Sequence, residues 1–401
     1  MKYLFAAIPV FVIALFVSDQ ILGLAGFPSG TPLQFAHPRN FEEVRKSIEF
    51  EYTFKTNDQG LRYASISLQK PPGEKRVLLL GDSFIEGLVQ SDETIGAYLE
   101  QRHSKPPTSA VRFINGGLSG RRPLDYWRLF QHVGRGYALD AVLVCIFAND
   151  VTGMPEQLSR QDLYATTSFA TNSESRMLIH LALPRIDTLV HQIHLERRMR
   201  AQRETDFLVQ ITEAAIGNGK TEAEVARWAS GLPRHLVEAS RRKEFNSAVF
   251  SVGFLQPYFW TDSLNIDTPR AERKYRSLVM SIDEILAVAR AERIGVGLVY
   301  LPSPLQYETR RYEPTEPWII AGAVVERRWL TDRTEVEKRL DHWAAERGVP
   351  FLNPTPVFRA HQDPVRPTNW KLDEHLNAFG NQVAADAITH WIKAEGILES
   401  R

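Results

Sequence analysis

The stretch that decides the fold is VLLLGDSF, residues 77–84. Its four consecutive apolar residues are typical of a short strand buried on both faces of a parallel sheet. The strand ends at Gly81, which permits a sharp turn, and Ser83 follows at once. Open α/β sheets bind ligands beyond the carboxyl ends of their strands, where this order puts Ser83. The same letters also describe an ordinary turn between strand and helix. The other strand ends must decide between these two interpretations.

Strand and helix patterns alternate along most of the chain. Further apolar runs predict strands at Val111–Asn115, Ala141–Phe147, Gly295–Leu301 and Val349–Leu352. Helices are predicted from residue 91 to about 102, from residue 123, and over 272–293, 335–347 and 378–393. This alternation predicts an α/β fold in which a five-stranded parallel sheet is connected by right-handed crossovers.

The alternation of strand and helix patterns is interrupted once. Residues 155–265 carry no strand pattern, are rich in charge and are helical in character, which predicts a mainly helical insertion. Near its end, FLQPYFW at residues 254–260 is rich in aromatic side chains. These either line a cleft or pack the insertion against the rest of the domain.

The amino-terminal segment is strongly apolar. Residues 3–17 carry no charge, which suits the hydrophobic region of a signal peptide or a membrane anchor, and Asp19 falls near its end. We expect residues 1–27 to be an uncleaved single-pass anchor, with the catalytic domain extracytoplasmic (periplasmic in a bacterium). Cleavage and secretion is the alternative. Residues 28–50, rich in Pro and Gly, then form a linker, and residues 51–396 form the main domain.

Composition excludes some classes of protein. The 401 residues hold 48 Lys+Arg and 48 Asp+Glu, a net charge of +0, which gives no argument for a nucleic-acid partner. The one cysteine, Cys145, cannot form an internal disulfide. The sequence shows neither metal-ligand spacing nor a phosphate-binding glycine loop, so no metal and no cofactor are predicted.

One histidine is placed to act with Ser83. A serine hydroxyl becomes a useful nucleophile when a base takes its proton. Among 11 histidines, His375 lies after the last predicted strand and before the last helix, and so on the same sheet edge as Ser83. Asp373, two residues earlier, can accept the other ring N–H and stabilise the imidazolium. The alternative is a histidine that serves only the loop before a helix.

Attack on an ester also requires donors for the developing oxyanion. The backbone N–H of Ser83 is one candidate. The Gly116-Gly117 pair permits close approach of a second N–H, and Asn149 can donate a side-chain N–H from the end of its strand. Each pattern alone is common in turns, but their occurrence at successive strand ends favours catalysis.

Four short blocks of this sequence resemble those of the SGNH (GDSL-like) hydrolase family. The blocks are Gly81-Asp82-Ser83, Asn115-Gly116-Gly117, Asn149-Asp150 and Asp373-x-His375. Residues 56–62 and 299–303 resemble a bacterial, often membrane-anchored branch, and the resemblance covers roughly residues 50–395.

The resemblance implies a flavodoxin-like three-layer α/β/α sandwich and ester hydrolysis through an acyl-serine. It implies that Ser83 is the nucleophile, His375 the base and Asp373 the residue that orients this base. By the same likeness, the oxyanion donors are the N–H groups of Ser83 and Gly117 and the side chain of Asn149.

Two positions depart from the family pattern. Phe147 and Ala148 stand where a glycine usually precedes the asparagine, and only Glu374 separates Asp373 from His375, where two residues are usual. We expect a serine esterase that acts on an acyl or acetyl ester, with a small molecule or a cell-envelope glycan or lipid as substrate. An O-acyltransferase with the same machinery is one alternative. A catalytically silent glycan-binding protein, suggested by Phe147 and Ala148, is the other.

Overall fold

The structure is a computed structural model that describes residues 2–104, 110–168, 174–204, 206–313 and 322–399. The chain divides into two compact units. One comprises residues 1–34 and 160–210, and the other, the α/β unit, comprises residues 35–159 and 211–401. Each is described by itself.

The α/β unit is built on a five-stranded parallel sheet with the strand order β5-β4-β6-β8-β9. The strands are β4 (Lys75–Gly81), β5 (Val111–Gly117), β6 (Ala141–Phe147), β8 (Gly295–Leu301) and β9 (Phe351–Leu352). Numbered along the chain this order is 2-1-3-4-5, that of flavodoxin-like folds. The predicted fold class is confirmed. Only β9 is shorter than predicted, because Val349 donates its N–H to the end of the preceding helix.

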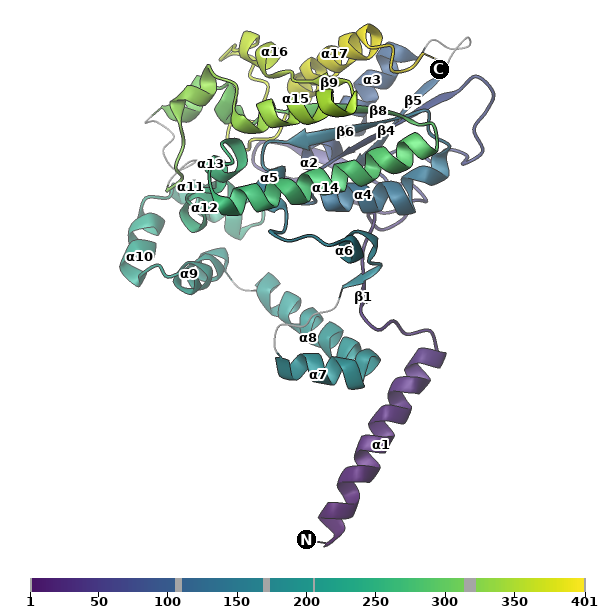
Figure 1. Cartoon of the computed structure of the whole chain (residues 1–401). Helices are drawn as coiled ribbons and strands as arrows, with labels where there is room; N and C mark the ends of the chain where they lie inside the picture. The colour runs from purple at the N-terminus through teal and green to yellow at the C-terminus, as the bar shows by residue number, and fades with distance from the viewer. Residues whose placement is uncertain (1, 105–109, 169–173, 205, 314–321, 400–401) are drawn as a thin grey trace. The chain divides into compact units, whose positions relative to one another are not determined.

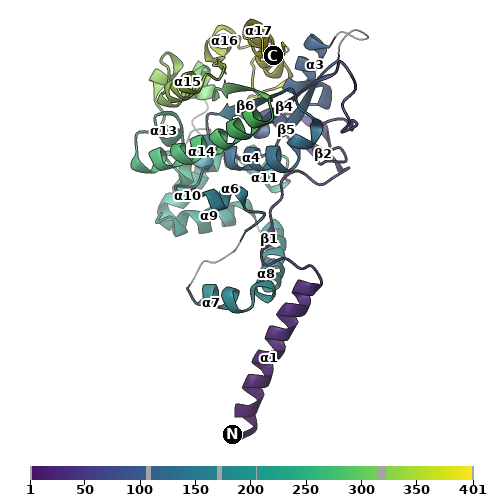
Figure 2. The ribbon, with the colours of Figure 1, turned by 45° about the vertical axis from the view of Figure 1, so that its right-hand side comes forward.

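Helices cover both faces of this sheet (Figures 1 and 2). One face carries α3 (Ile95–His103) and α17 (Ala378–Ala394), which pack on each other. The other carries α4 (Pro123–His132), α14 (Pro269–Ala291) and α15 (Glu335–Arg347). Trp343 of α15 donates its indole N–H to Asp283 of α14 at 3.0 Å. The three layers enclose strands whose apolar runs, such as Val77–Leu80, are fully buried.

The register of the strands brings their carboxyl ends to one edge. Gly81, the last residue of β4, lies beside Gly117 at the end of β5, and Phe147 of β6 lies beside Leu301 of β8. The segments that follow these residues therefore begin close together. They include α2 (Ser83–Glu86), α5 (Asp150–Gly153) and the 3₁₀ turn Pro304–Gln306.

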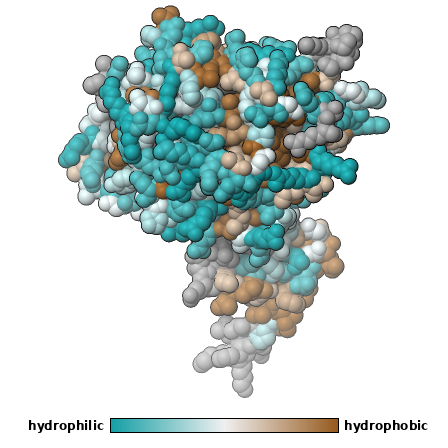
Figure 3. Space-filling model, turned by 45° about the horizontal axis from the view of Figure 1, so that its top comes forward, coloured by the Kyte–Doolittle hydropathy of each residue, from teal (hydrophilic) through white to brown (hydrophobic). Residues whose placement is uncertain are grey.

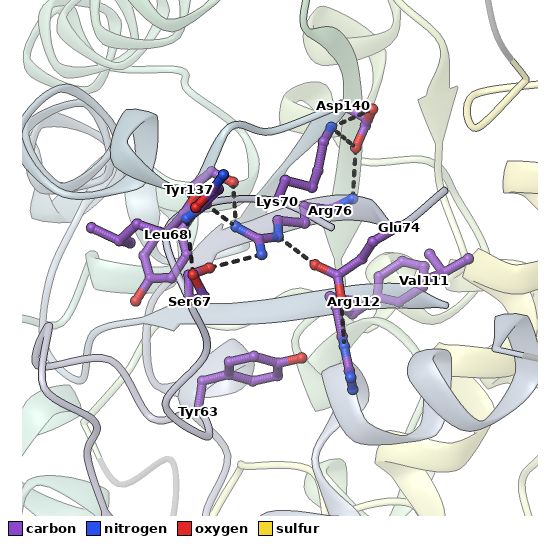
Figure 4. A network of polar contacts seen from close by, with 12 residues as sticks. Tyr63, Ser67, Leu68, Lys70, Glu74, Arg76, Val111, Arg112, Tyr137 and Asp140 are labelled. Atoms are coloured by element: carbon purple, nitrogen blue, oxygen red, sulfur yellow. Dashed lines mark hydrogen bonds and ion pairs between the residues drawn. The ribbon is translucent and has the colours of Figure 1, made fainter. Parts of the chain in front are cut away.

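A buried arginine holds the opposite, amino-terminal end of the sheet together (Figure 4). Arg76 is 1% exposed, and its Nε donates to Glu74 at 2.7 Å. Its other guanidinium nitrogens donate to the carbonyls of Ser67, Leu68 and Tyr137 at 2.8, 3.2 and 2.9 Å. The guanidinium therefore joins β4 to two loops at the end of the sheet remote from Ser83.

An antiparallel hairpin precedes the sheet in the α/β unit. It pairs β2 (Glu42–Lys46) with β3 (Glu51–Lys55), and its turn closes through a bond from Ser47 N–H to the carbonyl of Phe50 at 2.7 Å. Strand β3 lies at the start of the predicted main domain. Its partner β2 lies in the stretch that was expected to be linker, and all five of its residues pair with residues of β3.

The insertion is mainly helical where the structure describes it. In the α/β unit it contributes the rest of α9 (Phe207–Gly217), which begins in the other unit, and α10 (Glu222–Ser230), α11 (Arg234–Arg241), α12 (Ala248–Leu255) and α13 (Phe259–Leu264). A further helix of this unit is α16 (Thr355–Ala360), and its short 3₁₀ turns span 91–93, 134–137, 309–312 and 327–330.

The smaller unit combines the amino-terminal helix with the first part of the insertion. Its elements are α1 (Lys2–Leu24), β1 (Thr31–Pro32), α6 (Arg160–Tyr164), β7 (Thr167–Ser168), α7 (Glu174–Ala182) and α8 (Pro184–Glu204). The β1–β7 pair was not expected from the sequence. Asp19 is buried and accepts hydrogen bonds from the backbone N–H groups of Arg185 and Ile186 at 2.8 and 3.0 Å. Helix α1 is therefore joined to the start of α8.

Apolar side chains are exposed on this unit and are drawn brown in Figure 3. They include Val10, Phe11, Ile13 and Phe16 of α1 and Leu178 and Leu181 of α7. Within the residues that the structure describes, no helix meets the length and hydropathy that a membrane crossing requires. The predicted anchor over residues 1–27 lies partly outside the described residues and stays a prediction.

Candidate active site

Ser83 lies directly beyond the carboxyl end of β4, as predicted. The turn that presents it requires Gly81, because a Cβ there would lie 2.4 Å from Ile85 Cγ1. Asp82 begins α2 by accepting a hydrogen bond from the N–H of Phe84 at 2.9 Å. Burial raises the pKa of Asp82 to about 6. This packing leaves the Ser83 side chain half-buried at the sheet edge.

The structure brings together the three predicted catalytic side chains. Ser83 Oγ lies 2.7 Å from His375 Nε2, although the two residues are 292 positions apart. His375 Nδ1 faces the carboxylate of Asp373, and the backbone N–H of His375 donates to the same carboxylate at 2.9 Å. Because Asp373 accepts at Nδ1–H, Nε2 is the nitrogen left to accept the Ser83 proton. The single residue between Asp373 and His375 is therefore compatible with a serine–histidine–aspartate arrangement.

The electrostatics of this group favour an ion pair between Asp373 and His375. Burial opposes the charged imidazole, but the Asp373 carboxylate raises the pKa of His375 to about 9. Burial also opposes the charged carboxylate, yet His375 and its hydrogen bonds hold the pKa of Asp373 below its usual range. Burial raises the pKa of the neighbouring Glu374 to about 7. Asp373 thus stabilises the positive charge that His375 acquires when it takes the Ser83 proton.

The imidazole of His375 stacks on the aromatic ring of Phe84. The ring of Phe84 lies 4.7 Å from that of His375, with an interplanar angle of 26°. On its other side, Phe84 stacks on Phe147 at 3.7 Å and 19°. Phe147, one of the two departures from the family pattern, therefore sits beneath Phe84, where it is 1% exposed. Its bulk fixes the plane of the imidazole.

The loop that carries Asp373 and His375 is held from two sides. Glu49, in the turn between β2 and β3, accepts the backbone N–H groups of Leu372 and Asp373, each at 2.8 Å. Arg311 is 3% exposed and donates to the carbonyl of Asp373 at 3.1 Å. No local pattern in the sequence indicates either contact, and Glu49 lies more than 320 positions from its partners.

The predicted oxyanion donors differ in availability. The N–H of Gly117 donates to Asn115 Oδ1 at 2.9 Å, and a Cβ on Gly117 would lie 2.0 Å from the backbone nitrogen of Glu86. Gly117 thus serves close packing of β5 against α2, and its N–H is already occupied. In the described part of the chain, the N–H of Ser83 and the side-chain amide of Asn149 make no hydrogen bond.

A buried carboxylate orders the loop that follows β5. Glu86 is fully buried and accepts the backbone N–H of Ser119 at 2.7 Å. The same carboxylate contacts His37 at 2.9 Å and Arg45 at 2.7 Å. Burial opposes ionisation, but His37, Ser119 and Arg45 hold the pKa of Glu86 below its usual range. Gly120, which follows Ser119 in the chain, has φ +69° and is exposed. Its N–H has no partner among the described residues.

Asp150 supports the turn that carries Asn149. Its carboxyl receives the hydroxyl of Tyr126 at 2.9 Å and the backbone N–H of Phe147 at 2.9 Å. Burial and the nearby Asp82 raise its pKa well above the usual range. These bonds fix the turn from β6 into α5, at whose start Asn149 stands.

A cavity of about 220 Å³ adjoins this group of residues. Its lining includes His375, Asn149 and Arg311 together with residues of α12 and α13. Of the aromatic stretch 254–260, Phe259 and Trp260 line this cavity, whereas Phe254 stacks on Trp228 at 4.6 Å. Some residues of that stretch therefore line a cleft, and another packs within the insertion. Among the described residues, no cluster of three or more His, Cys, Asp or Glu side chains could hold a metal ion.

Comparison with known proteins gives structural likeness only. No protein-family model matches this chain, and no curated protein matches it. A lipase/acylhydrolase from Enterococcus faecalis aligns at 12% identity and TM-score 0.36, covering 80% of this chain and 96% of its own. A GDSL-like lipase from Bacteroides thetaiotaomicron aligns at 11% identity and TM-score 0.35, covering 82% and 92%.

A third similar structure is a catalytic mutant of an acetylxylan esterase from Geobacillus stearothermophilus, at 13% identity and TM-score 0.36, covering 82% of this chain and 97% of its own.

Proposed function

We propose that this protein is a serine esterase that hydrolyses an acyl ester through an acyl-serine intermediate. The observation that carries the proposal is the hydrogen bond of 2.7 Å between Ser83 Oγ and His375 Nε2, with Asp373 at the other ring nitrogen. A nucleophile, a base and a residue that orients the base, linked in this order, form the arrangement that acyl transfer to serine requires.

In the first half of the reaction, Ser83 Oγ attacks the ester carbonyl carbon while its proton passes to His375 Nε2. The tetrahedral intermediate collapses, the bond to the alcohol oxygen breaks, and His375 returns the proton to that oxygen. In the second half, water attacks the acyl-serine and gives a proton to His375. The carboxylic acid leaves as Ser83 Oγ recovers the proton, so the enzyme is regenerated.

The developing oxyanion requires hydrogen-bond donors that are free in the resting protein. The N–H of Ser83 and the side chain of Asn149 meet this condition. We assign the third position to the N–H of Gly120 in place of Gly117, whose N–H is occupied by Asn115. The bond from Ser119 to Glu86 holds the backbone just before Gly120 and supports this assignment.

The direct test is covalent labelling of the full chain with a serine-reactive fluorophosphonate, together with an assay on p-nitrophenyl esters. We expect wild type to be labelled and to cleave esters, and Ser83→Ala to do neither. His375→Ala should lose nearly all turnover, on the order of 10⁴-fold or more. Equal labelling of Ser83→Ala would reject Ser83 as the nucleophile, and failure of wild type in both assays would reject the esterase.

Attachment to a membrane through residues 1–27, with the α/β unit extracytoplasmic, belongs to the same proposal. The uncharged run of residues 3–17 and the exposed apolar side chains of α1 support it. The full-length protein should sediment with membranes and resist extraction by high salt. Recovery of a mature chain that lacks residues 1–27 would instead favour a cleaved signal and secretion.

A further inference from the structure

The cavity beside His375 has one apolar wall that belongs to the helical insertion. Ala248, Val249 and Val252 of α12 line it. Because residues three and four apart share a helix face, these three side chains form one apolar strip along α12. Phe259 and Trp260 of α13 extend the wall. None of these residues has a role in the proton transfer proposed above.

Contacts with two other helices of the α/β unit, α10 and α5, hold this wall in place. Phe254, at the end of α12, stacks on Trp228 of α10 with an interplanar angle of 7°. Ser263 of α13 lies 2.5 Å, hydroxyl to hydroxyl, from Thr152 of α5, the helix that begins after Asn149. The strip is therefore held at a set distance from the candidate oxyanion donor, so the cavity has a defined width.

The polar part of the cavity lining offers little attraction to an anion. The guanidinium of Arg311 is paired with the buried carboxylate of Glu308 at 2.8 Å. It also donates to the carbonyls of Trp370 and Asp373 at 3.2 and 3.1 Å. Glu374, when it is ionised, repels an anion. An uncharged, apolar group therefore fits the cavity best.

We propose that this cavity binds the apolar chain of the ester substrate, and that α12 sets the length of chain the enzyme prefers. The proposal rests on the esterase function and selects a longer acyl or alkyl ester over an acetyl ester of a small alcohol. A cavity of about 150 Å³ is known to hold benzene, so the 220 Å³ present here accommodates about six to nine carbon atoms. His375 and Asn149 line the cavity, which is therefore continuous with the reacting centre.

Two series of esters distinguish whether the apolar chain in the cavity belongs to the acyl part or to the alcohol part of the substrate. In the first, the p-nitrophenyl group is constant and the acyl part lengthens from acetyl to decanoyl. In the second, the acetyl part is constant and the alcohol lengthens from ethyl to decyl. Binding of each methylene raises kcat/KM by up to about fourfold, so at least one series should rise by tenfold or more by six carbons and then level off. The series that rises identifies the part of the ester in the cavity.

Variants of Val252 test whether binding in this cavity causes the rise in kcat/KM with chain length. Val252→Phe fills the space, and Val252→Thr keeps its shape but adds a hydroxyl. Both should reduce the ratio of kcat/KM for the six-carbon ester to that for the two-carbon ester by about tenfold. Gln256→Phe, an exposed position at the end of α12 that does not line the cavity, should leave the ratio unchanged. Val252→Thr remains informative if the larger Phe disturbs folding.

The outcomes separate failure of this inference from failure of the esterase. If wild type cleaves esters but neither series rises, the cavity does not bind a chain. The same holds if the rise persists in both Val252 variants. If wild type cleaves no ester and resists the fluorophosphonate, the esterase function itself is rejected, and this inference with it.

Discussion

At the scale of single residues, the site is organised around the charge on one imidazole. His375 contacts the carboxylate of Asp373 at one ring nitrogen and the hydroxyl of Ser83 at the other. Phe84 fixes the ring plane, and its own position depends on Phe147. The phenylalanine that breaks the family pattern therefore has a structural use that the sequence did not reveal.

The pKa of His375 predicts the pH dependence of the reaction. A general base must be neutral to accept a proton, and Asp373, Glu374 and Asp82 together raise the pKa of His375 to about 9 despite burial. We expect kcat/KM to rise about tenfold per pH unit toward pH 9 and to level off above it. In Asp373→Asn the midpoint should fall toward the ordinary value of about 6.5 and the plateau should drop by orders of magnitude. An unchanged midpoint in a pH profile of kcat/KM would contradict the pairing.

Because proton binding by His375 is coupled to folding, the Asp373–His375 pair makes stability depend on pH. A raised pKa in the folded state means that the Asp373–His375 pair stabilises the protein fully below the unfolded pKa of His375, about 6.5. That contribution is lost as the pH rises through about 9. The gain in activity with pH is therefore accompanied by a loss of stability. Thermal melts across pH 6 to 10 should show a smaller decline in Asp373→Asn than in wild type.

At the scale of elements, the β2–β3 hairpin supports two separate loops of the site. From its turn, Glu49 accepts two backbone N–H groups of the Asp373 loop. From β2, Arg45 pairs with Glu86, which in turn accepts the N–H of Ser119. A segment expected to be partly linker is thus a support for catalysis.

Glu49→Gln should weaken the Asp373 loop without unfolding the protein. The two N–H groups bond to different oxygens of Glu49, and in glutamine one of these positions becomes an NH2 group that can only donate. One of two charge-assisted bonds is therefore lost. We expect kcat/KM to fall on the order of tenfold, with the circular dichroism spectrum unchanged. Glu51→Gln, an exposed change in the same hairpin, is the matched control and should have wild-type activity. Full activity of Glu49→Gln would show that other contacts of the loop, such as those of Arg311 and Asn369, hold it without Glu49.

Glu86→Gln should affect both stability and turnover. It removes the buried carboxylate that pairs with Arg45 and His37, although Arg45 keeps its pair with Glu43. The free energy of unfolding should therefore fall by about 1–3 kcal/mol. We expect a lower Tm, measured by calorimetry, and a loss in kcat larger than any change in KM, because the loop before Gly120 is no longer fixed. Glu42→Gln, whose partner Lys55 is exposed, is the control for a surface pair. A lower Tm with kcat unchanged would limit Glu86 to a structural role.

At the scale of the whole α/β unit, stability and chemistry are placed at opposite ends of the sheet. Arg76 lies near the amino end of β4, and Ser83 follows its carboxyl end, about 20 Å along the strand. The buried guanidinium of Arg76 satisfies Glu74 and three backbone carbonyls. Changes at this end are therefore expected to alter folding with little effect on the reacting centre.

Arg76→Met tests this separation. Removal of the guanidinium takes one donor from Glu74, which keeps Arg112, and leaves three buried carbonyls without the donor they had. The free energy of unfolding should therefore fall by about 3–5 kcal/mol. Arg112→Met, which removes a more exposed partner of Glu74, should cost about 1 kcal/mol or less. Urea denaturation gives both values. Per folded molecule, Arg76→Met should keep the wild-type kcat/KM, and a selective loss of kcat would contradict the separation.

The sequence by itself determined the strands, their alternation with helices, and the residues that follow each strand end. Runs of four to seven consecutive apolar residues are typical of strands buried inside a parallel sheet, and right-handed crossovers between such strands fix which loops share an edge. These rules are local, so they placed Ser83, Asn149, Asp373 and His375 on one edge without any knowledge of their contacts.

Only the tertiary structure decided which groups at that edge remain free to act. It showed that the N–H of Gly117 is occupied by Asn115, that Glu49 and Glu86 hold the loops, and that α12 walls a cavity. Each of these depends on residues that approach through packing. The bond between Glu49 and Asp373, for example, spans 324 positions. No periodicity or short motif records such an approach, because its geometry is set by the sum of many contacts in between.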